Sequence, residues 1–315
     1  MKPAKSRAVF LLMKKLWAVL FLLLMIPACR AFDEHTVAKE LEFAKTKRTY
    51  LLHVPPNVSK PAPLVIVLHG GGGKGSQMEE MSGFTALSDK AGFIAAYPDG
   101  IGRNWYDGRE GDFSEAHKEK RDDSGFIGAM IDEIAKHHEI DEKRIYATGI
   151  SNGGFMSNYL AVKLNAKLAA VAPVIGGIGD PFHKEFKLET PVSALIIQGT
   201  DDPLVPYNGG EVAKGRGKLI STEQALRLWV TATGCKKEPA TDALDDRDPK
   251  DSCRVTRMRY TGGKAEVEFL KVVGGGHTWP GGPQYLPKMI VGTVCRDFDC
   301  AYIWEFFKAH PKQDR

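Results

Sequence analysis

Three short motifs contain residues that could act together in nucleophilic catalysis. They are Gly149-Ile-Ser-Asn-Gly153, Gln198-Gly-Thr-Asp-Asp-Pro203 and Gly274-Gly-Gly-His-Thr-Trp-Pro280. A serine hydroxyl is a poor nucleophile until a histidine takes its proton, and that histidine needs an acidic group to orient it. The motifs supply Ser151, an aspartate and His277 in that chain order. This order is typical of hydrolases in which the serine lies on a sharp turn between a strand and a helix.

The sequence around Ser151 predicts such a turn. Gly149 and Gly153 would relieve crowding where the chain reverses, because side chains at these positions would clash. A G-x-S-x-G pattern also arises by chance in a chain with 33 glycines, so the pattern alone is a weak signal. Its place between the strand-like run 144–148 and the helix-like run 153–164 makes a nucleophile the better interpretation.

The second and third motifs provide the acid and the base. Asp202 is the predicted acid and Asp201 is its rival, since both follow the end of a strand-like run. Either aspartate could instead cap the turn before Pro203. His277 is the predicted base because it lies in a glycine-rich loop after the acid motif. His117 lies in a polar stretch, and we expect it to be exposed to solvent.

Attack on an ester or amide creates an oxyanion that requires hydrogen-bond donors aimed at it in advance. The backbone N–H of Asn152, directly after the nucleophile, is one predicted donor. The second is expected from the glycine run that follows His69, with Gly71 as the predicted residue. A phosphate-binding loop is the alternative, but neither G-K-[ST] nor a dinucleotide-binding pattern accompanies these glycines.

Three aromatic residues are predicted to line the substrate pocket: Trp105, Tyr106 and Trp279. Trp279 lies two residues after the predicted base, which places it near the reacting atoms. Trp105 could equally be a core residue, since large aromatic side chains are buried on average.

The elements expected to position these residues alternate between strands and helices. Buried strands are predicted at 63–68, 93–97, 168–175 and 194–197, and the apolar spacing over 123–137 predicts a helix. The run 46–55 is predicted to be an edge strand. A helix is expected after Ser221, two further strands over 254–260 and 265–273, and a final helix over 302–310. The alternation predicts a mostly parallel, doubly wound sheet covered by helices on both faces. With the serine motif and the order of the serine, aspartate and histidine, it predicts an α/β-hydrolase fold.

Residues 1–31 have the features of an export signal. Lys14-Lys15 precedes the apolar run 16–26, which is short for a membrane span and is followed by small residues. The start is Met1 or Met13. Cleavage after Ala31 would release a secreted or periplasmic protein in which residues 32–315 form a single catalytic domain. Cleavage before Cys29 would give a lipid-anchored protein instead, and a retained anchor helix is a third alternative. Of the cleaved forms, only the one lipidated at Cys29 is expected to contact a membrane.

The remaining composition argues against several functional classes. Six of the 43 basic residues and none of the 39 acidic residues lie in 1–31, so the rest of the chain carries a small negative net charge and predicts no nucleic-acid surface. Four cysteines follow the leader, and their even number predicts the disulfides Cys235–Cys253 and Cys295–Cys300. No metal site is expected, because no histidine is near either pair in sequence and no C-x-x-C occurs.

Several motifs together resemble one known group of enzymes. They are Leu68-His-Gly-Gly-Gly-Gly73, Tyr97-Pro-Asp-Gly100, Asp122-Asp-Ser-Gly-Phe-Ile127, Thr148-Gly-Ile-Ser-Asn-Gly-Gly154, Gly199-Thr-Asp-Asp-Pro-Leu-Val-Pro-Tyr207 and Gly275-Gly-His-Thr-Trp-Pro-Gly281. They resemble secreted polyhydroxybutyrate-depolymerase-like esterases, a group that includes feruloyl and acetylxylan esterases of the first carbohydrate-esterase family. The resemblance covers about residues 46–309. It implies that the acid is the aspartate before proline, Asp202, and the chain departs from it at Gln198, where relatives often have histidine.

The combined expectation is an exported serine carboxylic-ester hydrolase that needs no cofactor, metal or obligate protein partner. The expected substrate is a polymer-attached ester, with feruloyl or acetyl groups of plant polysaccharide preferred over hydroxyalkanoate polymers. A peptidase on the same fold is a rival within the hydrolases. A catalytically inactive carbohydrate-binding or adhesion module is the alternative from another class. The sequence leaves the oligomeric state open.

Overall fold

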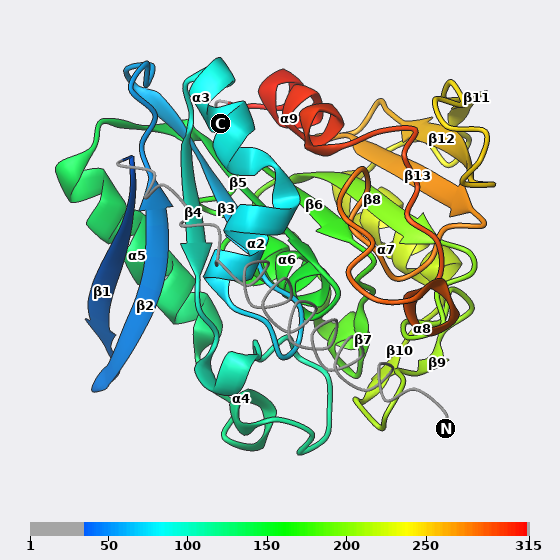
Figure 1. The fold of residues 1–315 in the computed structure, drawn as a ribbon, viewed down its shortest axis with the longest axis horizontal. Helices are drawn as coiled ribbons and strands as arrows, with labels where there is room; N and C mark the ends of the chain where they lie inside the picture. Colours follow the sequence, from blue (N-terminus) through cyan, green and yellow to red (C-terminus); the bar gives the residue numbers. More distant parts are fainter. Residues whose placement is uncertain (1–34, 314–315) are drawn as a thin grey trace, which may run out of the picture. The chain divides into compact units, whose positions relative to one another are not determined.

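The computed structural model describes residues 35–313, which are built around one ten-stranded sheet (Figure 1). The strand order is β1-β2-β4-β3-β5-β6-β8-β13-β12-β11. The six strands from β4 to β13 pair in parallel, and antiparallel strands flank them at both ends. The bounds are β1 (Thr36–Phe43), β2 (Thr46–His53), β3 (Ala62–Leu68), β4 (Ile94–Pro98), β5 (Ile140–Ile150), β6 (Ala170–Val174), β8 (Ser193–Gly199), β11 (Ala240–Ala243), β12 (Arg254–Tyr260) and β13 (Val267–Val273).

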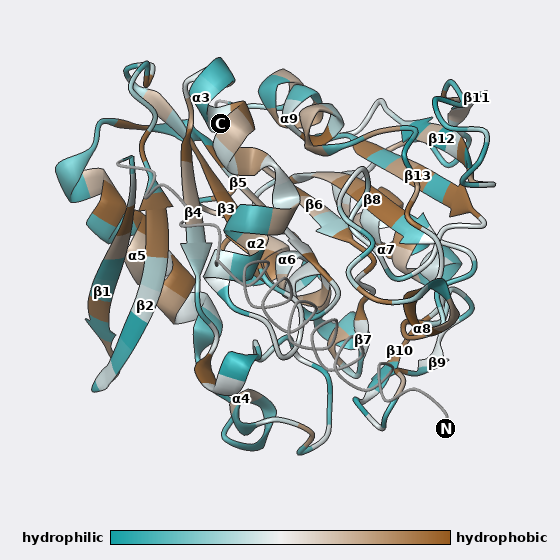
Figure 2. Ribbon diagram, in the orientation of Figure 1, coloured by the Kyte–Doolittle hydropathy of each residue, from teal (hydrophilic) through white to brown (hydrophobic). Residues whose placement is uncertain are grey.

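Helices cover both faces of this sheet. One apolar core contains residues of α5 (Asp123–His137), α6 (Asn152–Lys163) and α7 (Thr222–Thr233), and the other contains residues of α2 (Gly75–Ser82), α3 (Phe84–Ala91) and α9 (Cys300–Ala309). Strand β3 is buried along its whole length, with Leu64 and Ile66 in the first core and Val65 and Val67 in the second. Figure 2 shows the resulting hydrophobic colouring of the central strands. The predicted α/β-hydrolase fold with helices on both faces is confirmed.

Short elements occupy the loops near the carboxyl ends of the central strands. Strands β7, β10 and β9 form a separate three-stranded sheet. The bounds are η1 (Ile101–Arg103), α4 (Glu115–Lys118), β7 (Gly179–Asp180), η2 (Phe182–Glu185), β9 (Gly210–Glu211), β10 (Lys218–Leu219) and α8 (Lys288–Val291).

Local sequence signals fix several boundaries. The predicted helix over 123–137 matches α5. Ser221 caps α7, since its hydroxyl accepts from the Gln224 N–H while the Gln224 side chain accepts from the Ser221 N–H. The prediction that 46–55 is an edge strand is wrong, because β1 lies outside β2 in the sheet. The sequence does not predict strand β1, because most of its side chains are exposed and its residues are largely polar.

The cysteines do not pair as the sequence analysis predicts. All four described cysteines are free thiols. Cys235 belongs to one core, where its thiol donates to the carbonyls of Tyr260 and Ala265, whereas Cys253 and Cys295 belong to the core on the other face of the sheet. The sulfur atoms of Cys253 and Cys295 lie within 4.8 Å of each other. The prediction that Cys235 joins Cys253 is therefore wrong, because it follows nearness in sequence and the sheet separates the two residues. The predicted disulfide Cys295–Cys300 is also wrong, because both thiols are free and the Cys295 sulfur lies beside Cys253.

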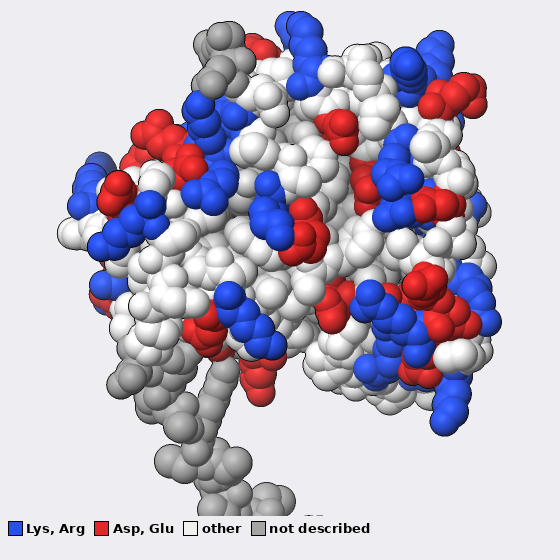
Figure 3. Space-filling model, turned by 90° about the horizontal axis from the view of Figure 1, so that it is seen from above, with Lys and Arg blue, Asp and Glu red and all other residues white. Residues whose placement is uncertain are grey.

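The charged surface and the helix lengths bear on what the protein can bind. Lys, Arg, Asp and Glu are intermixed over the face shown in Figure 3, which has no extended area of one sign. No helix among residues 35–313 combines the length and apolar character that crossing a membrane requires. The predicted leader, including Cys29 and both candidate start residues, lies outside the described residues.

Candidate active site

Ser151 lies on a strained turn between β5 and α6. Its backbone angles are φ 56° and ψ −119°, a conformation that side chains rarely adopt. A Cβ atom at Gly149 would lie 2.7 Å from the Leu68 carbonyl oxygen, and one at Gly153 would lie 2.3 Å from the same atom. Both positions thus require glycine, and the turn holds the Ser151 side chain at the carboxyl end of the sheet, as a nucleophile requires.

His277 and Asp202 form a buried pair. The two residues lie in loops after β13 and β8, which are neighbouring parallel strands. His277 Nδ1 lies 2.8 Å from Asp202 Oδ2, and the Asp202 side chain has no exposed surface. The other oxygen, Oδ1, accepts from the backbone N–H groups of Leu204 and Val205. Asp202 thus remains an acceptor toward the imidazole, which leaves His277 Nε2 as the nitrogen available to a nucleophile.

Asp201 has a different role in the structure. It is exposed, and its carboxylate accepts from the Thr200 hydroxyl. Its backbone N–H donates to the Gly275 carbonyl, which joins the two loops that present the pair. The geometry therefore places Asp202, and not Asp201, beside His277.

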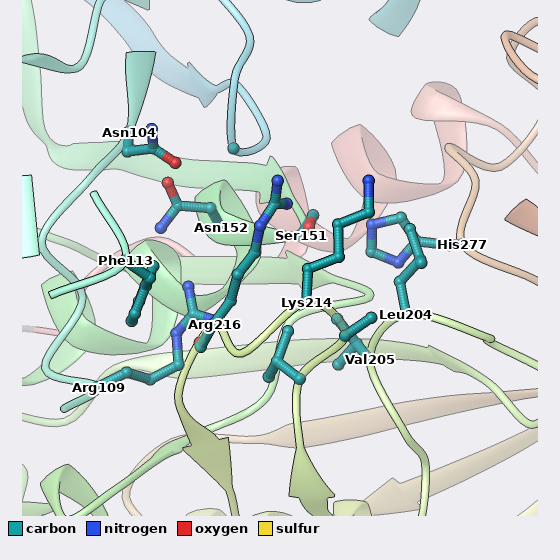
Figure 4. Close-up of a pocket in the computed structure, with 13 residues that line it drawn as sticks. Asn104, Arg109, Phe113, Ser151, Asn152, Leu204, Val205, Lys214, Arg216 and His277 are labelled. Carbon is teal, nitrogen blue, oxygen red and sulfur yellow. The ribbon is translucent and has the colours of Figure 1, made fainter. Parts of the chain in front are cut away.

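Ser151 and His277 line the same cavity (Figure 4). Its volume is about 50 Å³, which is room for roughly three or four water molecules. The Ser151 hydroxyl makes no hydrogen bond within residues 35–313, and contacts between a nucleophile and its base are often loose before substrate binds. Both predicted oxyanion residues, Gly71 and Asn152, also line the cavity.

The backbone N–H groups of Gly71 and Asn152 have no hydrogen-bond acceptor among the described residues. They are therefore available to an oxyanion. His69 orders the loop that carries Gly71, since its Nδ1 donates to the Gly70 carbonyl and its Nε2 accepts from the Gly100 N–H. Burial lowers the pKa of His69, which keeps the imidazole neutral and able to accept.

A buried network holds the start of α6 against the loop over 105–117. The Asn152 side chain exchanges hydrogen bonds with the backbone of Trp105 and donates to the Asp107 carboxylate. Asp107 also pairs with Arg109 at 2.7 Å and with His117 at 3.0 Å. Burial alone would raise the pKa of Asp107, but Arg109 and His117 outweigh it and hold that pKa below its usual range. The expectation that His117 is solvated is wrong, because this network buries its ring.

Two of the predicted pocket aromatics are core residues. Trp105 is fully buried and donates from Nε1 to the His69 carbonyl, and Trp279 is 1% exposed and donates to the Ser82 carbonyl. Neither can contact a substrate in the cavity, so these predictions are wrong. Tyr106 lines a separate cavity beside Arg109 and Tyr159. The aromatic residue in the active-site cavity is Phe113.

Four polar residues on the far side of the cavity were not predicted from the sequence. These are Asn104, Arg109, Lys214 and Arg216. No fixed spacing connects them to the catalytic motifs. The signal that could have revealed two of them is the short basic and glycine-rich run Lys214-Gly-Arg-Gly217, which follows the acid motif by a dozen residues.

One group of possible metal ligands lies outside the active-site cavity. The ligand atoms of Asp251, Cys253 and Cys295 all lie within 4.8 Å of one another. Both Asp251 oxygens already accept backbone hydrogen bonds, from the N–H groups of Cys253 and Arg296. Local hydrogen bonds to Asp251 and the nearness of the two thiols thus account for this cluster without a metal ion.

Comparison with known proteins agrees with the fold and the type of site. Residues 52–225 match the family model described as phospholipase/carboxylesterase. The chain belongs to the phospholipase/carboxylesterase family. It is 32% identical to the protein named "Putative esterase NocK" from Nocardia uniformis subsp. tsuyamanensis, over 85% of this chain and 81% of that protein.

Two further similarities extend this assignment. Feruloyl esterase B of Piromyces equi is 31% identical to this chain. The match covers 69% of this chain but only 40% of the length of that esterase. The solved acetyl xylan esterase of Aspergillus awamori has the same fold, with a TM-score of 0.58, 17% identity and coverage of 86% of this chain and 99% of that one. As a member of the phospholipase/carboxylesterase family, the chain is a carboxylic ester hydrolase of the α/β-hydrolase fold.

Proposed function

We propose that the protein hydrolyses esters through an acyl-enzyme formed on Ser151. The observation that carries this proposal is the buried His277–Asp202 pair, 2.8 Å apart, facing the cavity that Ser151 also lines. His277 takes the Ser151 proton as the hydroxyl oxygen attacks the ester carbonyl, and it later protonates the departing alcohol. Asp202 holds the imidazole and stabilises its protonated form. Water then attacks the acyl group in the same manner and releases the acid.

The oxyanion of each tetrahedral intermediate would be stabilised by the N–H groups of Gly71 and Asn152. Support comes from their positions in the cavity wall and from their lack of other acceptors in the described part of the chain. Asn152 is held by its side chain to the Trp105 backbone and to Asp107, so the donor is fixed before substrate arrives. Such preorganised donors contribute about 3–4 kcal/mol to transition-state stabilisation.

The proposed substrate is an ester with a short acyl group attached to a polymer outside the cell. The burial of Trp105 and Trp279 removes the aromatic surfaces that favoured a phenolic acyl group. Acetylated plant polysaccharide is therefore preferred over feruloylated polysaccharide, and hydroxyalkanoate polymers are the alternative. Residues 1–31 are proposed to direct export, with lipidation of Cys29 as the alternative.

A substrate panel tests this proposal. The purified protein should release acetate from 4-nitrophenyl acetate and acetylated xylan with a kcat/KM at least tenfold above that for methyl ferulate. A faster reaction with methyl ferulate would contradict the short-acyl assignment. No turnover of any ester, together with binding to polysaccharide, would favour the inactive binding module. Amino-terminal sequencing of the exported protein should give Phe32 as its first residue.

A further inference from the structure

The active-site cavity carries uncompensated positive charge. Three cationic side chains line it, Arg109, Lys214 and Arg216, and no acidic side chain does. Arg109 is paired with Asp107. Lys214 and Arg216 form no ion pair or side-chain hydrogen bond within residues 35–313. Two unpaired cations therefore face the proposed nucleophile, although the chain after the leader has a small negative net charge.

The loop that carries these two cations is held in place by backbone contacts. The Val212 N–H donates to the Gly217 carbonyl and closes the loop on itself. The Ala213 N–H donates to the carbonyl of Leu204, which lies in the loop after Asp202. On the other side, Arg109 Nη1 donates to the Arg216 carbonyl at 2.8 Å. The loop is thus attached both to the loop of the proposed acid and to the buried network around Asp107.

The two side chains extend from this loop into the cavity. In Figure 4, Arg216 reaches toward Asn152 and Ser151, and Lys214 extends toward His277. The Arg216 guanidinium lies near the proposed oxyanion loop, since a Cβ atom at Gly71 would lie 3.7 Å from Arg216 Nη1. A group attached to the reacting ester would therefore lie within reach of both cations.

From this arrangement we infer that the enzyme selects esters that carry a carboxylate close to the scissile bond, bound by Arg216 and Lys214. The guanidinium can bind a carboxylate through two parallel hydrogen bonds, and the ammonium adds a second positive charge. The inference rests on the proposed function of Ser151 and adds a substrate class to it. Such a carboxylate could belong to a uronic acid unit that carries the acyl group, or to the free end of a hydroxyacid ester.

The loop also has a glutamate close to it, since a Cβ atom at Gly215 would lie 3.8 Å from Glu211 Oε1. Glu211 lies at the end of β9 and is exposed. Its carboxylate makes no ion pair with Lys214 or Arg216 in the described structure.

Two pairs of esters that differ only in the carboxylate test the inference. The first pair is 3-acetoxybutyrate and its methyl ester, which represent the hydroxyacid source. The second pair is acetylated polygalacturonate and the same polymer after methyl esterification, which represent the uronic acid source. Acetate release gives kcat/KM for each. At least one charged ester should be preferred over its neutral partner by about tenfold, as expected for a charge-assisted hydrogen bond in the transition state.

The cation variants locate the source of that preference. Arg216→Gln and Lys214→Gln should each reduce it severalfold, because kcat/KM should fall more for the charged ester than for its neutral partner. Salt at 0.5 M should reduce it in the native protein, because exposed charges are screened at that ionic strength. Arg227→Gln and Lys184→Gln are matched controls, because both residues are exposed and lie outside the cavity. They should leave the preference unchanged.

Two results would overturn the inference and leave the proposed function standing. One is equal or better hydrolysis of the neutral ester in both pairs. The other is an equal loss for charged and neutral esters in Arg216→Gln and Lys214→Gln, which would mean that the cations act on the ester group itself. Failure of every ester, together with failure of a fluorophosphonate to label Ser151, would instead remove the proposed function and the inference with it.

Discussion

Replacing Asp202 with asparagine should abolish most activity without unfolding the protein. The carboxylate accepts three hydrogen bonds, one from His277 Nδ1 and two from the backbone N–H groups of Leu204 and Val205. An asparagine that keeps the two backbone hydrogen bonds must turn its NH₂ toward His277 Nδ1. The imidazole can then avoid two facing donors only by moving its proton to Nε2, the nitrogen that must accept the proton of Ser151.

The size of the effect follows from this change of tautomer. In hydrolases with a serine, histidine and aspartate arranged in this way, the same substitution lowers kcat by about 10⁴-fold, equal to about 5.4 kcal/mol. The opposite orientation of the amide is also unfavourable, because its NH₂ would face the backbone N–H groups of Leu204 and Val205. We therefore expect a loss of kcat close to that value on 4-nitrophenyl acetate.

A neighbouring aspartate provides the matched control. Asp201→Asn removes an exposed carboxylate whose only side-chain partner within residues 35–313 is the Thr200 hydroxyl, and it should change kcat less than twofold. Urea unfolding should show that Asp202→Asn remains folded. A loss of less than tenfold in Asp202→Asn, or equal losses in the two variants, would refute the assignment of the acid.

Three further predictions concern the surroundings of the site. Asp107→Asn should destabilise the protein by about 3 kcal/mol in urea unfolding at pH 7, because it leaves Arg109 buried without its partner; since the pKa of Asp107 is lowered, the difference from the native protein should shrink only below about pH 4. Because the pKa of His69 is lowered in the folded protein, the unfolded chain takes up a proton at this residue at a higher pH than the folded protein does, and the native protein loses stability as the pH drops below about 6.5. His69→Gln should make this loss of stability smaller. An unchanged dependence of the unfolding free energy on pH would contradict the assignment. Oxidation of the purified protein should join Cys253 to Cys295, with a stabilisation of about 2–4 kcal/mol if the bond is unstrained, and peptide mapping that finds Cys235 joined to Cys253 would contradict the structure.

The sequence predicts the parts of the site that follow from strand endings. Ser151, Asp202 and His277 each come shortly after a buried parallel strand, and the carboxyl ends of such strands meet at one edge of the sheet. Their apolar runs and flanking glycines are local signals, so their positions can be predicted without the structure. The choice of Asp202 over Asp201 required more, because local signals fit both residues. The family resemblance implies Asp202, and in the structure the Asp202 carboxylate lies beside His277.

Contacts between loops could not be predicted in this way. Lys214 and Arg216 reach the cavity because the loop over 212–217 is tied to Arg109 and Leu204, and these contacts join segments that are distant in sequence. Trp279 is buried against a segment that is distant in sequence, since its Nε1 donates to the Ser82 carbonyl and its ring packs near Phe84. The spacing of hydrophobic residues predicts which face of a helix or strand is buried. It does not predict which loops contact one another.

The nucleophile is the central claim, and covalent labelling tests it most directly. A fluorophosphonate probe reacts with a serine that has an activated hydroxyl, and mass spectrometry of the digested protein identifies the labelled peptide. We predict one equivalent of label on Ser151, loss of esterase activity in step with labelling, and neither label nor activity in Ser151→Ala. Label on another serine, or near-normal ester hydrolysis by folded Ser151→Ala, would contradict the account.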